Sequence, residues 1–300
     1  MKKIIVVGSS NTDLVVRSPK LPEPGETLIG SKFFSTQGGK GANQAVAAKR
    51  AGGEVIFIAK VGNDGYGKEA VKQYDEDGIC TDFIKVSESS PTGIAIITVD
   101  DRGENTIVVA SGANSELRPI DLQLDEEEIR EAEYFLVQLE TPLETVNALA
   151  YFCRINNKKL VLNPAPATPL SAPILQDLFM ITPNETEAEL LTGVKIRDLV
   201  AAKVAAGKLI EKGVKHVIIT LGERGAFYHD GKNSYHVPSP KVNPVDTTAA
   251  GDTFNGALIV ALSEGKGMEA AIEFANKLAG ISTTKEGAQA SIPYRKEIVF

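Results

Sequence analysis

Short apolar segments with the character of buried strands alternate with helical patterns along most of this 300-residue chain. The expected strands are Lys3–Gly8, Val55–Val61, Tyr134–Gln138, Leu160–Asn163, Phe179–Thr182 and His216–Leu221. The expected helices are Ala42–Ala51, Tyr66–Asp77, Pro142–Asn156 and Asp198–Lys212. Strands that are apolar throughout and separated by helices predict an α/β fold, in which a largely parallel central sheet has helices on both faces. Such sheets bind their ligands at the carboxyl ends of the strands.

Two stretches depart from this alternation. Residues 14–36 are extended and contain three prolines, and residues 92–110 predict a hairpin that turns at Asp100–Gly103. Together they predict a small antiparallel sheet inserted into one α/β domain that takes in residues 1–300. A small sheet beside a ligand site is typical of a lid. A surface decoration or a contact between subunits is the alternative, and a lid can also be such a contact.

Composition narrows the classes of function. Hydrophobic residues make up 43% of the chain and charged residues 24%, as in a globular protein with a large core. The net charge of −7 argues against a nucleic-acid surface. No segment is long and apolar enough to predict a membrane span, and Ile4–Val7 is too short for the hydrophobic region of a signal peptide. Cys80 and Cys153 are isolated, which predicts reduced thiols in a cytoplasmic protein.

The segment Asp246–Gly256 predicts a tight turn of small residues that runs directly into a helix. Ala249, Ala250 and Gly251 would leave the first N–H groups of that helix free, and these groups with the helix dipole suit a phosphate. Asp252 would lie at the same place, where a carboxylate can take a proton from an attacking hydroxyl. An ordinary Asp at a helix N-terminus is the alternative, and this segment alone does not decide between them.

Polar and glycine-rich segments follow other expected strands. Gly38–Gln44 opens a helix, and its three glycines would let the backbone approach a ligand next to Lys40 and Asn43. Asn11 and Asp13 follow the first strand, where they could recognise a polyol or simply form a turn.

Two further segments have both a functional and a structural interpretation. In Thr182–Glu187, Asn184 and Glu187 have the spacing of a helix-capping box, and they could also lie near a hydrated Mg²⁺ and phosphates. Thr220–Gly225 ends a strand with open backbone that suits a nucleotide or an ordinary turn. The generic nucleotide signatures are missing: the chain has no G-x-x-x-x-G-K-[ST] loop, and no G-x-G-x-x-G follows the first strand. Their absence disfavours a P-loop kinase and an NAD-linked oxidoreductase.

Taken together, these segments resemble the PfkB-type (ribokinase-like) family of sugar kinases, and the resemblance covers essentially the whole chain. The matching segments are Gly38–Asn43, Gln138–Glu140, Asn163–Ala167, Thr182–Glu187, Asp246–Gly256 and Lys285–Ser291. Several long matches in the right order are more specific than any single motif.

The resemblance implies a role for each matching residue. Asp252 would be the base that activates a sugar hydroxyl, with the backbone of Ala249, Ala250 and Gly251 as an anion hole. The residues implied to hold the sugar are Asn11, Asp13, Gly39, Lys40, Asn43, Glu140 and Asp252. The residues implied to lie near ATP, Mg²⁺ and the phosphates are Asn184, Glu187, Thr220, Gly222, Gly225, Gly251 and Asn276. The residues implied to form a monovalent-cation site, for K⁺, are Asp246, Thr248, Ser282, Gly287 and Ser291.

The resemblance also implies an activity and an assembly. The activity is ATP-dependent phosphorylation of the 5-hydroxyl of D-ribose, with Mg²⁺ as cofactor and K⁺ as activator, and the assembly is a homodimer formed through the lid sheet. A related kinase for deoxyribose, another sugar or a nucleoside is the first alternative. A non-catalytic sugar-binding regulator on the same fold is the second, and the retention of Asp252 beside an intact Ala-Ala-Gly turn argues against it.

Overall fold

The structure, a computed structural model, describes residues 2–298 and is built on a nine-stranded sheet with the order β13-β12-β11-β10-β9-β8-β1-β4-β5. The strands are β1 (Lys3–Val7), β4 (Glu54–Gly62), β5 (Ile84–Ser87), β8 (Tyr134–Val137), β9 (Lys159–Leu162), β10 (Met180–Ile181), β11 (His216–Thr220), β12 (Ala226–His229) and β13 (Ser234–Val237). From β5 to β11 all neighbours are parallel, and β12 and β13 add an antiparallel edge. The predicted α/β class with a largely parallel sheet is confirmed.

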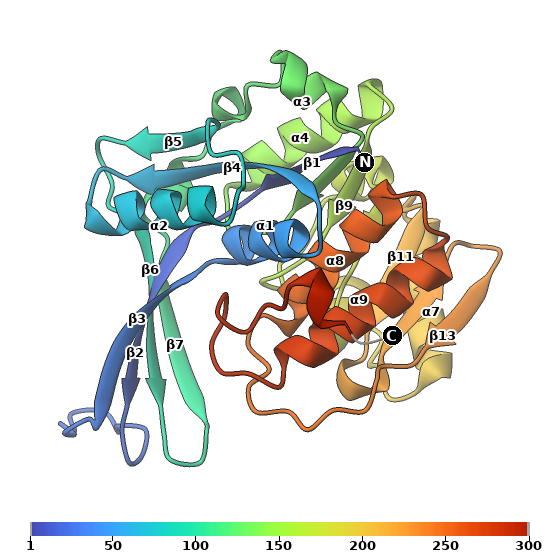
Figure 1. The fold of residues 1–300 in the computed structure, drawn as a ribbon. Coiled ribbons are helices and arrows are strands. Elements are labelled where there is room, and N and C mark those ends of the chain that lie inside the picture. Colours follow the sequence, from blue (N-terminus) through green and yellow to red (C-terminus); the bar gives the residue numbers. More distant parts are fainter. Residues whose placement is uncertain (1, 299–300) are drawn as a thin grey trace.

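Helices cover both faces of this sheet (Figure 1). One face packs against α1 (Lys40–Arg50), α2 (Gly65–Glu76), α8 (Ala250–Ser263) and α9 (Met268–Ser282). The other packs against α3 (Glu127–Glu131), α4 (Leu143–Ile155), α5 (Ala172–Asp177), α6 (Glu185–Thr192) and α7 (Leu199–Glu211). In β1, Ile4 and Val6 join the first core while Ile5 and Val7 join the second. This alternation explains why the strand is apolar throughout.

A second, four-stranded sheet projects away from the α/β body that the nine-stranded sheet and its helices form (Figure 1). Its strands are β2 (Asn11–Arg17), β3 (Lys32–Gly38), β6 (Gly93–Val99) and β7 (Asn105–Ala110), in the order β3-β2-β6-β7. The two outer pairs are antiparallel, but the central pair β2–β6 is parallel. This differs from the wholly antiparallel sheet expected from the sequence, because β2 and β6 come from separate segments that both leave the body in the same direction.

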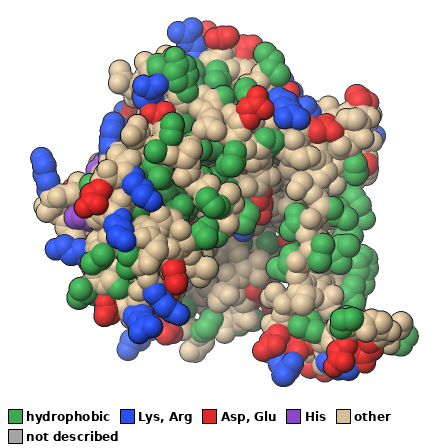
Figure 2. All heavy atoms as spheres, turned by 180° about the vertical axis from the view of Figure 1, so that it is seen from behind, with side chains coloured by type: hydrophobic (Ala, Val, Ile, Leu, Met, Phe, Trp, Pro, Cys, Tyr) green, Lys and Arg blue, Asp and Glu red, His purple; other side chains and the backbone are tan. Residues whose placement is uncertain are grey.

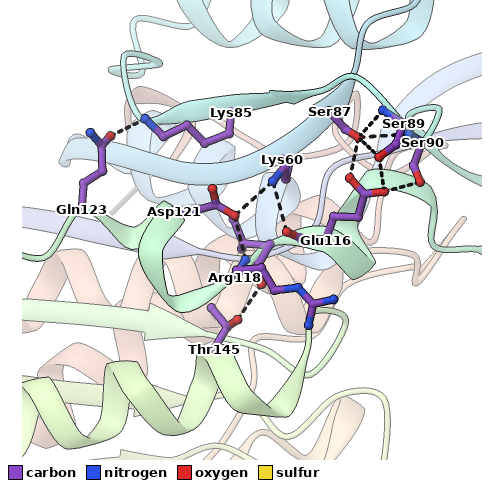
Figure 3. Close-up of polar contacts among 11 residues, drawn as sticks. Lys60, Lys85, Ser87, Ser89, Ser90, Glu116, Arg118, Asp121, Gln123 and Thr145 are labelled. Atoms are coloured by element: carbon purple, nitrogen blue, oxygen red, sulfur yellow. Dashed lines mark hydrogen bonds and ion pairs between the residues drawn. The ribbon is translucent and has the colours of Figure 1, made fainter.

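The chain enters and leaves the β6–β7 hairpin through two loops that are held together. The 3₁₀ helix η1 (Gly112–Glu116) follows β7, and the carboxylate of Glu116 accepts hydrogen bonds from three serine hydroxyls, one at the end of β5 and two in the loop that leads to β6 (Figure 3). These donors are Ser87 at 2.5 Å, Ser89 at 2.9 Å and Ser90 at 2.5 Å. The hydrogen bonds lower the pKa of Glu116 to about 2. The base of the hairpin is therefore fixed to the body by an ionised carboxylate.

The expected strands of the central sheet lie within one or two residues of the observed ones, as do the four expected helices. The strands β5, β12 and β13 were not predicted. Among residues 2–298, none of the helices combines the length and the apolar character required to cross a membrane.

Candidate active site

The side chain of Asp252 lies in the first turn of α8, at the carboxyl ends of the central strands, and is only 8% exposed. Its Oδ2 accepts a hydrogen bond from Asn43 Nδ2 and its Oδ1 accepts one from Gln44 Nε2, each at 2.9 Å. Burial raises the pKa of Asp252, while Lys40 and the two amide donors oppose that rise. The result is a fixed carboxylate with a raised pKa, as a general base for a hydroxyl requires.

The turn before Asp252 leaves backbone N–H groups free at the start of α8, next to the Asp252 side chain. Ala249 has the left-handed conformation, with φ of 59°, and is the N-cap of α8. Within residues 2–298, the N–H groups of Gly251 and Asp252 have no protein acceptor, while that of Ala250 donates to the carbonyl oxygen of Thr247 at 3.2 Å. An anion at this helix N-terminus would therefore meet Gly251 and Asp252 before Ala250.

Asp13 lies on β2 with its carboxylate against the backbone of Gly38, where an added Cβ would lie 2.2 Å from Oδ2. The carboxylate is buried and accepts no hydrogen bond from the protein within the described residues. Burial raises the pKa of Asp13 to about 7; the charges of Glu140 and Asp252 add to the rise and Lys40 opposes it. A buried acceptor without a donor is costly, so this position suits a ligand that brings hydroxyl groups.

Lys40, the first residue of α1, is the cation at the centre of these carboxylates. Its Nζ lies 3.8 Å from Oε1 of Glu140, whose Oε2 accepts hydrogen bonds from the Lys40 backbone N–H at 3.0 Å and the Ser9 hydroxyl at 2.5 Å. Burial alone would lower the pKa of Lys40, but the charges of Asp252, Glu140 and other carboxylates outweigh it and raise the pKa. Lys40 is therefore a charged group that can contact either the sugar or the transferred phosphate.

Asn11, the first residue of β2, is held by a residue that the sequence did not single out. Asn114, on η1, donates from Nδ2 to Oδ1 of Asn11 at 2.7 Å, and its Oδ1 accepts from the Ser10 backbone N–H at 2.8 Å. The amide nitrogen of Asn11 is thus left to face a ligand as a donor. In addition, Oδ1 of Asn43 is buried without a hydrogen-bond partner. The sugar positions expected from the sequence therefore lie together and retain free polar atoms.

A cleft of about 150 Å³ lies beside Asp252. It is lined by Lys40, Asn163, Ala165, Thr182, Asn184, Glu187, Thr220, Thr247, Ala249, Ala250, Gly251, Asp252 and Asn255. The capping box is present, because Asn184 Oδ1 accepts from the Glu187 N–H and Glu187 Oε2 accepts from the Asn184 N–H, each at 2.8 Å. Burial raises the pKa of Glu187. The pair thus caps a helix and lines the cleft, and the two interpretations are compatible.

This donor set fits a hydrated Mg²⁺ that arrives with phosphates rather than a metal held by protein alone. Within residues 2–298, no group of three or more His, Cys, Asp and Glu side chains is placed to hold a metal ion. Mg²⁺ commonly keeps several waters and binds one or two carboxylates together with substrate phosphates. Glu187 supplies such a carboxylate in the cleft.

The expected nucleotide residues are only partly brought together. Thr220 lines the cleft and forms an isolated bridge with Asn184, and Gly222 and Gly225 flank the short turn that follows it. Asn276 is buried in α9 and donates to the carbonyl oxygens of Val237 at 3.1 Å and Pro238 at 3.3 Å. Its side chain fixes the loop after β13 and is not part of the cleft lining.

Three segments that the sequence assigned to a monovalent cation converge beside the turn of α8. Asp246 Oδ1 accepts from the Thr248 N–H and its Oδ2 accepts from the Gly287 N–H at 2.9 Å. Burial raises the pKa of Asp246, but these hydrogen bonds outweigh it and lower the pKa. The hydroxyls of Ser291 and Ser282 donate to backbone carbonyl oxygens of their own segments, those of Ala288 and Ala279 respectively. One ionised carboxylate among small residues fits a large monovalent cation that binds mainly carbonyl oxygens.

Comparisons with known proteins agree with this geometry. Residues 1–295 match the family described as pfkB family carbohydrate kinase. A ribokinase from Haemophilus influenzae is 46% identical over 296 residues, with 99% of this chain and 97% of that protein covered. A deoxyribokinase from Salmonella typhi is 36% identical over 97% of this chain and 95% of its own length. The solved structure of Arabidopsis thaliana ribokinase complexed with ribose and ATP has a TM-score of 0.91 at 32% identity, covering 98% of this chain and 96% of that chain.

The fold and the site define a phosphotransferase that acts on a hydroxyl group. More closely, the chain belongs to the PfkB family of carbohydrate kinases.

Several polar residues of the site were not given a role from the sequence. Gln44, Asn163, Thr182 and Asn255 form a buried hydrogen-bonded chain behind Asp252. A signal for Gln44 was present, since α1 is buried along Gly41–Ala48 and a polar residue in such a helix must find partners.

Proposed function

We propose that this protein transfers the terminal phosphoryl group of ATP to the 5-hydroxyl of D-ribose. The observation that carries the proposal is the arrangement at the start of α8. There, a buried carboxylate held by two amides lies next to unpartnered backbone N–H groups and lines a cleft of about 150 Å³ together with Lys40. In-line transfer needs a base on one side of the phosphoryl group and charge stabilisation around it. Asp252 would be the base, with Gly251 and its neighbours as the anion hole.

The roles of the remaining residues follow from their surroundings. Asp13, Asn11 and Asn43 would bind sugar hydroxyls: the Asp13 carboxylate is buried, Asn11 uses only its Oδ1 within the described residues, and Asn43 Oδ1 has no partner there. Lys40 would hold a phosphate oxygen and keep Asp252 ionised. Mg²⁺ bound to the nucleotide phosphates, near Asn184 and Glu187, would supply further charge stabilisation. K⁺ near Asp246 would hold the segment that leads into the turn.

The choice of ribose over related sugars rests on the ribose-side polar groups and on the relatives. A site built to pair a hydroxyl discriminates strongly against an analogue that lacks it, because its own polar groups stay unpaired. The deoxyribokinase relative makes 2-deoxyribose the second candidate substrate. Ribose is favoured because the ribokinase from Haemophilus influenzae is 46% identical to this chain and the deoxyribokinase only 36%.

An ADP-release assay with ATP and Mg²⁺ tests the proposal against a panel of ribose, 2-deoxyribose, hexoses and nucleosides. We expect the highest kcat/KM with ribose. In Asp252→Asn the amide keeps the shape but cannot accept the proton, so kcat should fall by ~10²–10⁴-fold while sugar affinity changes much less. A wild-type enzyme that ignores ribose and phosphorylates a nucleoside contradicts the substrate assignment. An Asp252→Asn variant with normal turnover contradicts the base assignment.

We also propose a homodimer formed through the small sheet, which would serve as a lid over the sugar. Large apolar side chains are exposed on it, including Phe33 at 64%, Ile96 at 51% and Val108 at 68%. They lie together on one face, since Val16 pairs with Phe33 and Ile96 pairs with both Leu14 and Val108. Figure 2 shows hydrophobic side chains along this sheet and a hollow between it and the body. An exposed apolar face of this kind marks a contact surface.

The oligomeric state tests this assembly. Sedimentation or light scattering should give a dimer for the wild type and a monomer for Val108→Glu, which places a charge in the apolar face. A monomeric wild type at micromolar concentration would contradict the dimer.

A cytoplasmic location also belongs to this proposal. It is supported by the free thiols of Cys80 and Cys153, which suit a reducing compartment.

A further inference from the structure

The base Asp252 has a partner that no sugar or nucleotide would contact. Gln44 is completely buried on α1, and its Nε2 donates to Oδ1 of Asp252 at 2.9 Å and to Oδ1 of Asn163 at 3.0 Å. Its Oε1 accepts from Nε2 of Gln138 at 2.5 Å. Both donors and the acceptor of the Gln44 amide are therefore used. A flipped amide would place its carbonyl oxygen against the Asp252 carboxylate, so only one orientation is favourable.

The same chain of hydrogen bonds continues to the anion-binding turn. Nδ2 of Asn163 donates to the carbonyl oxygen of Thr182 at 3.2 Å, and the Thr182 hydroxyl donates to Oδ1 of Asn255 at 2.6 Å. Nδ2 of Asn255 then donates to the carbonyl oxygen of Gly251 at 2.8 Å. A connected set of buried amides thus fixes the base and the turn relative to each other.

We propose that Gln44 is a positioning residue for catalysis, which holds the carboxylate of Asp252 in the orientation that accepts the sugar proton and ties it to the anion-binding turn. This inference rests on the proposed function, because it assigns a role relative to the general base. Asn43 alone would leave the carboxylate free to rotate about its bond to Cβ, since one hydrogen bond fixes only Oδ2. With Gln44 on Oδ1, both oxygens are fixed.

The electrostatic surroundings of Asp252 determine what a change at Gln44 should do to its proton affinity. The charged groups facing Asp252 are Lys40 from α1, Asp13 from β2, Glu140 after β8 and Glu187 from α6. Three of these four are carboxylates that disfavour a further negative charge, and Lys40 is the only cation among them. The hydrogen bonds from Asn43 and Gln44 therefore contribute to keeping Asp252 ionised.

The test compares Gln44→Glu and Gln44→Met with the wild-type enzyme in the ADP-release assay as a function of pH. Glu has the shape of Gln and keeps an acceptor for Gln138, but it cannot donate when ionised and adds a like charge, while Met removes the donors and the acceptor without adding a charge. We expect kcat to fall by roughly 10–100-fold in both, the loss typical of one hydrogen bond to a charged group. The acid limb of the kcat profile should move to higher pH, further in Gln44→Glu than in Gln44→Met. The KM for sugar should change little.

Two controls separate positioning from folding. Gln73→Glu makes the same charge change on the partly exposed surface of α2 and should leave kcat and its pH profile unchanged. Gln138→Met keeps the Gln44 donor but removes the group that orients it, so it should lower kcat by less than Gln44→Met and shift the profile in the same direction. This second variant keeps the inference testable if Gln44→Glu does not fold, as judged by thermal denaturation.

The possible results are distinguishable. An inactive wild-type enzyme contradicts the proposed function itself. An active wild type whose Gln44→Glu and Gln44→Met variants fold and retain kcat and its pH profile overturns the role of Gln44. A fall in kcat with no movement of the acid limb in any folded variant also overturns it, because a merely structural defect lowers activity without changing the proton affinity of the base.

Discussion

Helices α1 and α8 cross at Gly256, and the separation of Asp252, the proposed base, from its two amide donors depends on that crossing. A Cβ at position 256 would lie 2.6 Å from Cβ of Ala47 and from the backbone nitrogen of Ala48, and 2.8 Å from the carbonyl oxygen of Gln44. Ordinary contacts of a Cβ begin at 3.4 Å. The substitution Gly256→Ala therefore forces the two helices apart by about 0.8 Å, the difference between 3.4 and 2.6 Å.

Two opposing terms set the effect on stability. Replacing Gly by Ala inside a helix favours folding by about 0.8–1 kcal/mol. Overpacking a core typically costs about 1–3 kcal/mol. Gly207 on α7 provides the control, since a Cβ there meets nothing within 4 Å and only the favourable term applies. We expect Gly207→Ala to stabilise the protein and Gly256→Ala to be less stable than that control by about 1–3 kcal/mol. At roughly 2–4 °C per kcal/mol, the Tm values should differ by at least about 2 °C.

The activity should respond more strongly than the stability. The hydrogen bonds from Asn43 and Gln44 to Asp252 are 2.9 Å long, and a separation of about 0.8 Å would place them beyond hydrogen-bond range. Misplacing a catalytic group by about 1 Å can cost roughly 10²-fold in rate. Thermal denaturation and steady-state kinetics check both effects. A Gly256→Ala enzyme as stable as Gly207→Ala with full kcat would refute the reasoning, because it would show that the helices can separate without consequence.

Four further results are expected. Asp13→Ala should raise the KM for ribose, leave the KM for ATP nearly unchanged and narrow the preference for ribose over 2-deoxyribose. An equal rise in the KM for ribose and the KM for ATP would mean that Asp13 supports the fold and does not bind the sugar. Because the pKa of Asp13 is raised to about 7 in the folded protein, its contribution to stability is present below its unfolded pKa and is lost as pH rises through about 7. Asp13→Asn should therefore gain Tm relative to the wild type between pH 5 and 8, and a pH-independent difference would contradict this. Activity should rise when K⁺ replaces a bulky organic cation at equal ionic strength and lose that response in Asp246→Asn, whereas equal activity in both salts would count against the cation site. Glu116, with a pKa lowered to about 2, should stabilise the protein above pH 4.5 and lose that effect as pH falls toward 2, so the Tm advantage of the wild type over Glu116→Gln should shrink over this range.

The central sheet could be predicted from the sequence because its parallel strands are buried on both faces. Such strands consist of continuous apolar residues, as in β1, and are separated by helices that end at glycines. Of the strands that were missed, the two edge strands β5 and β13 lack this property, whereas β12 has three buried residues but is only four residues long. In β5 three of four residues are partly or fully exposed, and β13 has only one buried residue, Val237. An edge strand forms because it pairs with the neighbouring strand of the sheet, and its own residues give little indication that it is a strand.

In the candidate site, too, some features could be predicted from the sequence and others could not. Residues within one segment, such as Asp252 and the turn before it, could be predicted because a helix N-terminus creates an anion site from local backbone geometry. Gln44 and Asp252 are separated by 208 positions, and nothing in either segment gives their contact. The parallel pairing of β2 with β6 was also missed, because register across two distant segments is decided by how each leaves the body.

The charges of the site explain why its two halves have opposite chemistry. Asp13, Glu140, Asp252 and Glu187 surround a single lysine, Lys40. This excess of negative charge suits a neutral polyol, whose hydroxyl groups donate to carboxylates, but it opposes the approach of a polyphosphate. In the proposed function, the N–H groups at the start of α8, Lys40 and a divalent cation bound to the nucleotide would counter this repulsion. In the proposed function, Asp252 would lie at the boundary between the halves, where a hydroxyl from one side would reach a phosphorus atom from the other. A site with this charge distribution should bind ATP weakly without a divalent cation and ribose almost independently of it, and equilibrium binding of each substrate with and without Mg²⁺ distinguishes the two.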